Sequence, residues 1–236
     1  MNKYMKYSAT DRMSDLICEN YNLLLVMSRF GLSLGFGDKT VEQVCEQQGV
    51  HTGTFLAVVN FMDDECCISD EYYHKISVEA LIDYLRQAHS YFLDFNLPAI
   101  RRKLIDAIDC SQNDVAFLIL KFFDEYVNEV RAHMEYENQV VFGYVNCLLQ
   151  GKNYPGGYNI KVFADRHNQI EAKLTELKNI IVKYYPANIN NNQLNSVLFD
   201  IYSCEKDLCS HCRVEDYMFV PLIMEVENKI HHDARG

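Results

Sequence analysis

Long apolar runs are missing from this sequence, and its first residues lack the apolar segment that would predict a signal peptide. No stretch approaches the roughly 20 consecutive apolar residues that a membrane-spanning helix needs. The first 16 residues contain no uninterrupted apolar segment of the kind that signal peptides carry. The chain has nine cysteines, an odd number, so a disulfide framework is not expected. We therefore expect a protein with reduced thiols that works in the cytoplasm and has no membrane partner.

Basic residues are also scarce. The 236-residue chain has 22 Lys and Arg against 33 Asp and Glu, which gives a formal net charge of -11. Because phosphate binding needs clustered cations, this balance does not favour nucleic acid as a partner. Residues 40–60 can be read as a helix-turn-helix with Gly49 in the turn, but the second helix contains no Lys or Arg. No GxxxxGKS or GxxxxGKT string occurs, and neither a phosphate-binding loop nor a nucleophilic triad is expected.

Prolines and glycines are few, four and ten respectively, and most of them lie at residues 31–37, 49–53 and 151–157. Between these breaks apolar residues recur at helical spacing without sustained alternation, which predicts an all-α protein. We expect a small N-terminal helical domain at residues 1–65, an acidic linker at 66–76 and a larger helical domain at 77–236.

Local signals within these domains place several helix ends. In the small domain, Thr40 can cap a helix that Gly49 ends, and Thr52 or Thr54 can begin the next one. In the larger domain four long helical segments are expected, at residues 77–108, 112–150, 159–185 and 191–230. Their short connections predict an antiparallel up-down four-helix bundle. Pro98 lies inside the first segment and should kink or shorten that helix.

The apolar stripe of each long helix contains one histidine, and two stripes add a glutamate four residues later. These residues are His89, His133, His167 and His211, with Glu137 and Glu215. Positions three and four apart share a helix face, so all six side chains are expected to point into the bundle. The successive histidines are 44, 34 and 44 residues apart, and in an antiparallel bundle they can therefore return to the same height.

Such a set of inward polar residues favours a metal site. A single inward histidine is more often an ordinary core residue, and one His–Glu pair is often a surface ion pair. Buried carboxylates are costly unless a proton or a cation neutralises them, however, and here two lie among four histidines. Six nitrogen and oxygen ligands suit a pair of first-row metal ions better than one zinc, which prefers four. Two irons bridged by both glutamates and by an oxo or hydroxo group would leave about one open position per ion.

The same residues form a pattern that resembles a known family. His89 alone, then HMEYE at 133–137, then His167, then HCRVE at 211–215, resembles the hemerythrin-like HHE domain. More closely, the chain is similar to the di-iron iron-sulfur cluster repair (repair of iron centres) family, and the similarity covers nearly the whole chain. That family has a small N-terminal helical module, which SRFGLSLGFGDKTVEQVCEQQGV resembles.

The resemblance implies a function and a set of partners. It implies that the six residues named above hold two non-haem irons, which help restore iron-sulfur clusters damaged by nitric oxide or oxidants. Iron-sulfur proteins would then be clients, and no hydrolase or transferase site is expected. An alternative is a module that binds or senses dioxygen or nitric oxide, and a DNA-binding regulator is a third reading. A homodimer is left open, as is manganese in place of iron.

One departure from the family concerns thiols. The family's N-terminal module has a vicinal cysteine pair where this chain has Gly35, Phe36 and Gly37. The chain's own vicinal pair, Cys66 and Cys67, lies about 30 residues later in the expected linker, where a packing or linker role is favoured over a redox couple. We therefore expect the bundle to carry the function.

Further residues are secondary candidates. Glu171, Tyr126 and Tyr144 are expected either to support the metal ligands or to act as ordinary core and boundary residues. Cys209 and Cys212 bracket His211 in the string CSHC, which superficially resembles a zinc ligand pair, although ordinary reduced thiols are favoured.

Overall fold

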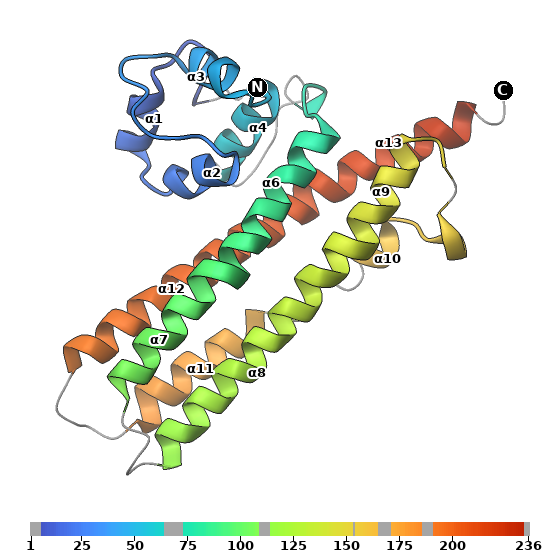
Figure 1. Cartoon of the computed structure of the whole chain (residues 1–236). Helices are drawn as coiled ribbons and strands as arrows, with labels where there is room; N and C mark the ends of the chain where they lie inside the picture. Colours follow the sequence, from blue (N-terminus) through green and yellow to red (C-terminus); the bar gives the residue numbers. More distant parts are fainter. Residues whose placement is uncertain are drawn as a thin grey trace. The chain divides into compact units, whose positions relative to one another are not determined.

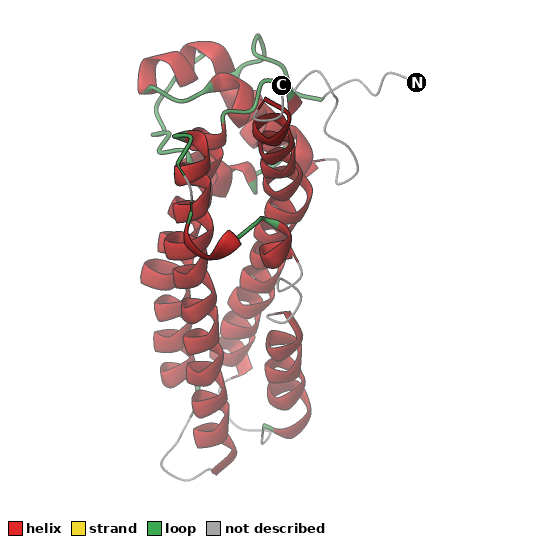
Figure 2. Cartoon of the chain, turned by 90° about the vertical axis from the view of Figure 1, so that its right-hand side faces the viewer, coloured by secondary structure: helices red, strands yellow, loops and turns green. Residues whose placement is uncertain are grey.

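The protein is all-α in the computed structural model, which describes residues 6–63, 73–108, 114–152, 154–164, 171–185 and 191–233. Figure 2 shows helices and loops, and the described residues contain no strand beyond an isolated bridge between Arg12 and Thr40. In this part of the chain no helix is long and apolar enough to cross a membrane. Residues 1–88 with 213–236 form one compact unit, and residues 89–212 form the other.

These two units divide the chain differently from the expected domains. Residues 64–72, which include Cys66, Cys67 and most of the expected linker, lie outside the described residues. The boundaries 1–65, 66–76 and 77–236 therefore stay a prediction. In the structure, the first unit also includes the start of the first long helix and the C-terminal segment.

The N-terminal part of the first unit consists of four short helices: α1 (Met13–Glu19), α2 (Leu23–Arg29), α3 (Val41–Gln48) and α4 (Thr52–Asp63). The predicted ends of α3 are confirmed. Thr40 forms a capping box with Gln43, and Gly49 ends the helix in the left-handed conformation at φ 70°. The structure also starts α4 at Thr52, one of the two predicted positions.

Helix α4 lies in the core of the first unit. Its side chains from Thr54 to Phe61 are all buried, and the ring of Phe55 packs edge-on against Phe30 with centroids 5.4 Å apart. A helix that is apolar on every face is expected to be buried. The helix-turn-helix reading of residues 40–60 is therefore wrong, because its second helix presents no free face to a DNA groove.

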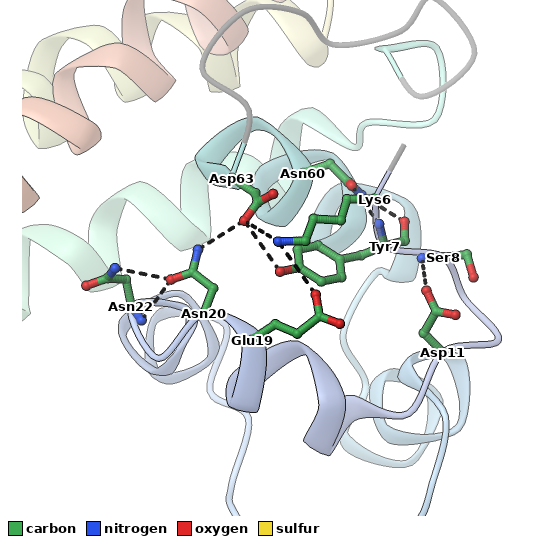
Figure 3. A network of polar contacts seen from close by, with 9 residues as sticks. All are labelled: Lys6, Tyr7, Ser8, Asp11, Glu19, Asn20, Asn22, Asn60 and Asp63. Carbon is green, nitrogen blue, oxygen red and sulfur yellow. Dashed lines mark hydrogen bonds and ion pairs between the residues drawn. The ribbon is translucent and has the colours of Figure 1, made fainter. Parts of the chain in front are cut away.

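Polar contacts hold the start of the described chain against the end of α4 (Figure 3). Asn60 accepts from the Tyr7 backbone N–H at 2.9 Å and donates to the Tyr7 carbonyl at 2.9 Å. Lys6 Nζ donates to Asp63 at 3.0 Å and lies 3.5 Å from Glu19. The hydrogen bond to Tyr7, followed by the one to Asp63, raises the pKa of Lys6. The Tyr7–Asn60 and Lys6–Asp63 hydrogen bonds together anchor residues 6 and 7 to α4.

The first unit also contains most of α6 (Val78–Ser90), the π-helical segment η5 (Glu215–Phe219) and α13 (Val220–Asp233). Tyr84 of α6 packs on Phe30 with ring centroids 4.8 Å apart. Phe61 of α4 lies 6.3 Å from Tyr217 and 5.9 Å from the Arg213 guanidinium carbon. The N-terminal helices therefore pack on both α6 and the chain that follows residue 212.

The second unit begins at His89 and contains the remaining helices. In order these are η1 (Tyr91–Asn96), α7 (Leu97–Ala107), α8 (Asp114–Tyr136), η2 (Glu137–Val141), α9 (Phe142–Leu149), η3 (Pro155–Gly157), α10 (Lys161–Ala164), α11 (Glu171–Tyr184) and α12 (Asn191–Val214). The four predicted long segments agree closely with these helices, together with α6 and α13. The expected all-α helical bundle is confirmed.

Ion pairs join neighbouring helices around this bundle. Arg101 binds Asp124 with contacts of 2.7 and 2.9 Å, which links α7 to α8, and Lys103 binds Asp200 at 2.6 Å, which links α7 to α12. Two further pairs, Lys173–Glu129 and Lys178–Glu205, link α11 to α8 and to α12. Figure 1 shows these four helices side by side. Exposed ion pairs contribute little stability, but each of these joins two neighbouring helices.

Three π-helical segments interrupt the long helices. In each the N–H after the segment bonds five residues back: Leu97 to Phe92, Phe142 to Glu137, and Val220 to Glu215. Prolines Pro98 and Pro221 follow two of them, and a wider turn removes the clash between a proline ring and the carbonyl four residues earlier. Pro98 does not shorten this helical segment, which continues from α6 through η1 and α7 to Ala107, so the predicted shortening is wrong and the predicted kink stays a prediction.

The predicted inward stripes form the core with few exceptions. Buried stripe residues include Ile82, Leu85, Phe92, Ile119, Val130, Phe163, Leu177, Val197, Ile201 and Met218. On α8, steps of three and four residues from Val115 predict Leu118 or Ile119 and then Phe122 as inward residues; Ile119 is buried and Leu118 is exposed. Phe123 is fully buried where the stripe predicted Phe122, because the inward face of α8 advances from Ile119 by four residues instead of three.

Candidate metal centre

Four polar side chains converge in the protein interior. His89, Glu137, His211 and Glu215 each offer one ligand atom, and these atoms all lie within 4.8 Å of one another. The four residues are 1%, 0%, 2% and 1% exposed, respectively. His89 lies near the end of α6 and His211 near the end of α12, whereas Glu137 and Glu215 are the first residues of η2 and η5.

The closest contacts in this cluster join ligand atoms directly. His89 Nε2 lies 3.1 Å from His211 Nε2 and 3.2 Å from Glu137 Oε2. His211 and Glu215 are four residues apart on continuous helix, so their side chains extend from the same face. Two imidazole nitrogens and the carboxylates therefore surround one point.

The chemistry of this donor set fits a transition-metal cation. Imidazole nitrogen and carboxylate oxygen together bind first-row metal ions such as iron, zinc and manganese. Two fully buried carboxylates would be costly beside neutral groups alone, and a cation among them offsets their charge. The cluster can therefore hold a metal ion through His89, His211, Glu137 and Glu215.

Aromatic rings hold the two histidines in place. The Phe142 ring stacks on the His89 ring at a centroid distance of 5.7 Å and an interplanar angle of 11°. Phe92 meets the His211 ring edge-on at 5.9 Å and 68°. Both phenylalanines are fully buried, so the imidazole planes are set by close packing.

His133 contacts the cluster through Glu137. Its Nε2 lies 2.6 Å from Glu137 Oε1, and its side chain is 20% exposed. The two oxygens of Glu137 consequently face different histidines: Oε1 faces His133 and Oε2 faces His89. Among the five site residues that the structure describes, His133 is the most exposed.

The structure thus brings together five of the six predicted ligands. His167 lies outside the described residues, and so does the side chain of Glu171, the first residue of α11. The complete six-residue ligand set stays a prediction, as does a supporting role for Glu171.

Tyr126 and Tyr144 are both buried residues of the second long segment. Tyr126 of α8 packs near Phe123, with ring centroids 6.5 Å apart. Tyr144 of α9 packs edge-on against Tyr154 and Tyr158, at 5.6 and 5.0 Å. The supporting role predicted for both tyrosines stays a prediction.

No described cysteine belongs to the cluster of four. The six cysteines within the described ranges form no disulfide there: Cys18, Cys45, Cys147, Cys204, Cys209 and Cys212. Cys209 and Cys212 are half-buried on α12, and His211 between them contacts His89. Burial raises the pKa of the Cys45 thiol to about 11, so this thiol stays protonated and unreactive at neutral pH.

Sequence reasoning missed two features of the site. Both ligand glutamates begin π-helical segments, for which Pro221 was an available signal in one case. Asn138, the residue after Glu137, places its Oδ1 3.1 Å from His89 Nδ1. Nothing in the helical periodicity singles out Asn138, because this contact joins residues 49 positions apart.

Comparisons with known proteins identify the family. A search of the curated proteins finds no match to this chain. The family described as the hemerythrin HHE cation binding domain matches residues 80–223, which is more than half of the chain and includes all four clustered residues. The chain therefore belongs to the hemerythrin HHE cation-binding family.

Proposed function

We propose that this protein is a non-haem di-iron protein that acts in the repair of iron-sulfur clusters damaged by nitric oxide or oxidants. Metal binding follows from the family and from the buried cluster of histidines and glutamates. The position of Glu137 supports two irons, and the sequence pattern of the ligands supports cluster repair as the process.

The observation that carries the two-ion proposal is the position of Glu137. Its Oε2 faces His89, which in turn contacts His211, while its Oε1 faces His133 on the other side. The chain therefore offers histidine nitrogens on both sides of Glu137 that could hold cations. One ion would lie with His89, His211 and Glu215, and a second with His133.

The chain's own residues would prepare such a site in three ways. The histidines and glutamates supply ligands, Phe142 and Phe92 hold the imidazole planes, and close packing keeps water away from the four buried ligands. Iron, when bound, supplies one-electron redox chemistry and a source of iron for exchange.

The burial of the ligands limits what can reach the ions. With four ligands at most 2% exposed, a protein client cannot contact the centre directly. His133, whose side chain is 20% exposed, marks the more open side of the described site. Iron-sulfur proteins would be the clients of the repair.

The resemblance of the ligand pattern to the iron-sulfur cluster repair family supports this process. The vicinal thiols of that family's N-terminal module are replaced by Gly35, Phe36 and Gly37. In our proposal the bundle therefore carries the function without a thiol step at residues 35–37. The protein would act in the cytoplasm.

A second function is favoured by the same burial. Ligands that are at most 2% exposed suit a small partner, such as dioxygen or nitric oxide, that the site would bind or sense. The N-terminal helices, which pack on the segment after residue 212 through Phe61, Arg213 and Tyr217, could then transmit the state of the site.

Metal analysis and a cell experiment test the proposal. Anaerobically purified protein should contain two irons per chain, identified by Mössbauer spectroscopy, and manganese should be absent. Cells lacking the protein should recover cluster-enzyme activity more slowly after nitric oxide exposure. Well under two irons per chain, together with unchanged recovery, would contradict the proposal. Reversible optical changes with dioxygen, without any effect on recovery, would favour the gas-binding function instead.

A further inference from the structure

The imidazole of His89 is held at both of its nitrogens. Nε2 faces the cluster, at 3.1 Å from His211 Nε2 and 3.2 Å from Glu137 Oε2. On the opposite side of the ring, Nδ1 lies 3.1 Å from Asn138 Oδ1. Two consecutive residues of η2, Glu137 and Asn138, therefore contact the same ring from opposite sides.

The contact with Asn138 decides which nitrogen carries the proton. A carboxamide oxygen can only accept, so Nδ1 must donate its hydrogen to Asn138 Oδ1. The neutral imidazole has a single N–H, and Nε2 is then left with a bare lone pair directed at the cluster. A metal ligand needs this arrangement, because the cation binds the unprotonated nitrogen.

The opposite tautomer has a partner within the site. If the proton lay on Nε2, it could be donated to His211 Nε2 at 3.1 Å, and it would then point toward the cluster of four. His211 can thus support the unproductive tautomer in metal-free protein. Asn138 opposes this preference from the other side of the ring.

One short segment supplies all of these contacts. Glu137 and Asn138 belong to η2, and Phe142, which stacks on the His89 ring at 5.7 Å, follows that segment directly. His89 itself comes from α6. At this π-helical turn, side chains of η2 and of the residue that follows it contact His89 of α6.

We propose that Asn138 is a positioning residue that holds His89 in the Nδ1–H tautomer and so prepares the cation site. The inference rests on metal binding by the family's domain and is independent of the number of ions and of any role in cluster repair. Asn138 acts through His89 and is not itself a ligand.

The first test measures the tautomer in metal-free protein. Long-range proton–nitrogen NMR on ¹⁵N-histidine-labelled protein should show His89 protonated at Nδ1. In Asn138→Leu, which removes the acceptor, the proton should move to Nε2. Gln139→Leu changes the exposed next residue of the same segment and should leave the tautomer unchanged. A wild-type His89 protonated at Nε2 would overturn the proposal, whether or not the leucine variant folds.

The second test measures affinity for Mn²⁺, Zn²⁺ and Fe²⁺, each added alone under anaerobic conditions. Asn138→Leu should bind about 10- to 100-fold more weakly than the wild type, the range typical for partners of metal-bound histidines. Asn138→Asp, which keeps an acceptor oxygen, should restore most of the affinity, and Gln139→Leu should match the wild type. Circular dichroism checks that the variants share one fold. Wild-type affinity in Asn138→Leu would overturn the proposal.

These outcomes are separable from those of the proposed function. If wild-type protein binds a single ion or cluster enzymes recover normally without it, the proposed function fails while the effect of Asn138 on tautomer and affinity can still hold. If the tautomer is unaffected, this inference fails and the proposed function is untouched.

Discussion

The two His–Glu pairs of the site have the same spacing in sequence and different surroundings in the fold. His133–Glu137 and His211–Glu215 each place a glutamate four residues after a histidine. In both pairs the glutamate begins a π-helical segment and its carbonyl accepts from the N–H five residues later. The histidines differ: His211 is 2% exposed and faces His89, whereas His133 is 20% exposed and faces its own Glu137.

This difference teaches that one motif can serve two roles within a single site. The pair on α12 and η5 belongs wholly to the buried cluster of four. The pair on α8 and η2 supplies a carboxylate shared between the cluster and His133, and it lies closer to solvent. What each pair does is set by the helices that pack against it.

The largest effect is expected from removing the shared carboxylate. Glu137→Ala should lower metal affinity by more than the about 100-fold upper range seen for residues that only support ligands, because both His89 and His133 lose their common partner. Metal content by mass spectrometry and titration measures this. Near-normal metal content would show that Glu137 is not the centre of the site.

Substitutions of the two histidines in the paired motifs should have different effects on metal content. His211→Ala removes a buried ligand that faces His89, so most bound metal should be lost. His133→Ala should leave one ion bound in the cluster of four, and the metal content per chain should fall to about half if two ions are present in the wild type. Equal losses of metal in His211→Ala and His133→Ala would show that the two His–Glu pairs have the same role.

Metal removal should lower the thermal stability. A cation at 100 times its Kd stabilises the folded state by about 2.7 kcal/mol, which corresponds to a Tm shift of roughly 5–10 °C for a chain of this size. Calorimetry of chelated and reconstituted protein measures the shift. The shift should be retained in part in His133→Ala and be absent in Glu137→Ala; an identical shift in all three proteins would contradict the assignment of ligands.

The smallest effect is expected at Glu135. This exposed residue of α8 lies between His133 and Glu137 in sequence but on another face of the helix. Glu135→Ala should therefore keep the wild-type metal content and a Tm within about 2 °C, since surface substitutions usually change stability by less than 0.5 kcal/mol. Loss of metal in this variant would mean that acidity alone, and not helix face, selects the ligands.

Much of the fold was predictable from local signals. Helical spacing, the cap at Thr40 and the glycine at position 49 predicted helices whose ends the structure confirms. The same spacing predicted that His89, His211 and both paired glutamates point inward, because three- and four-residue steps define a helix face. The prediction of Phe122 as an inward residue was wrong, since a drift of one position in a long helix puts the neighbouring Phe123 in the core instead.

The sequence by itself determined that the chain is helical and that buried histidines and carboxylates would need a cation. Only the tertiary structure decided which of them meet. His89 and His211 are 122 residues apart, and Asn138 reaches His89 from another helix through a π-helical turn. Periodicity reports the face on which a side chain lies. Its partners depend on the packing of helices that are distant in sequence, and so the buried His211 and the more exposed His133 could share one motif.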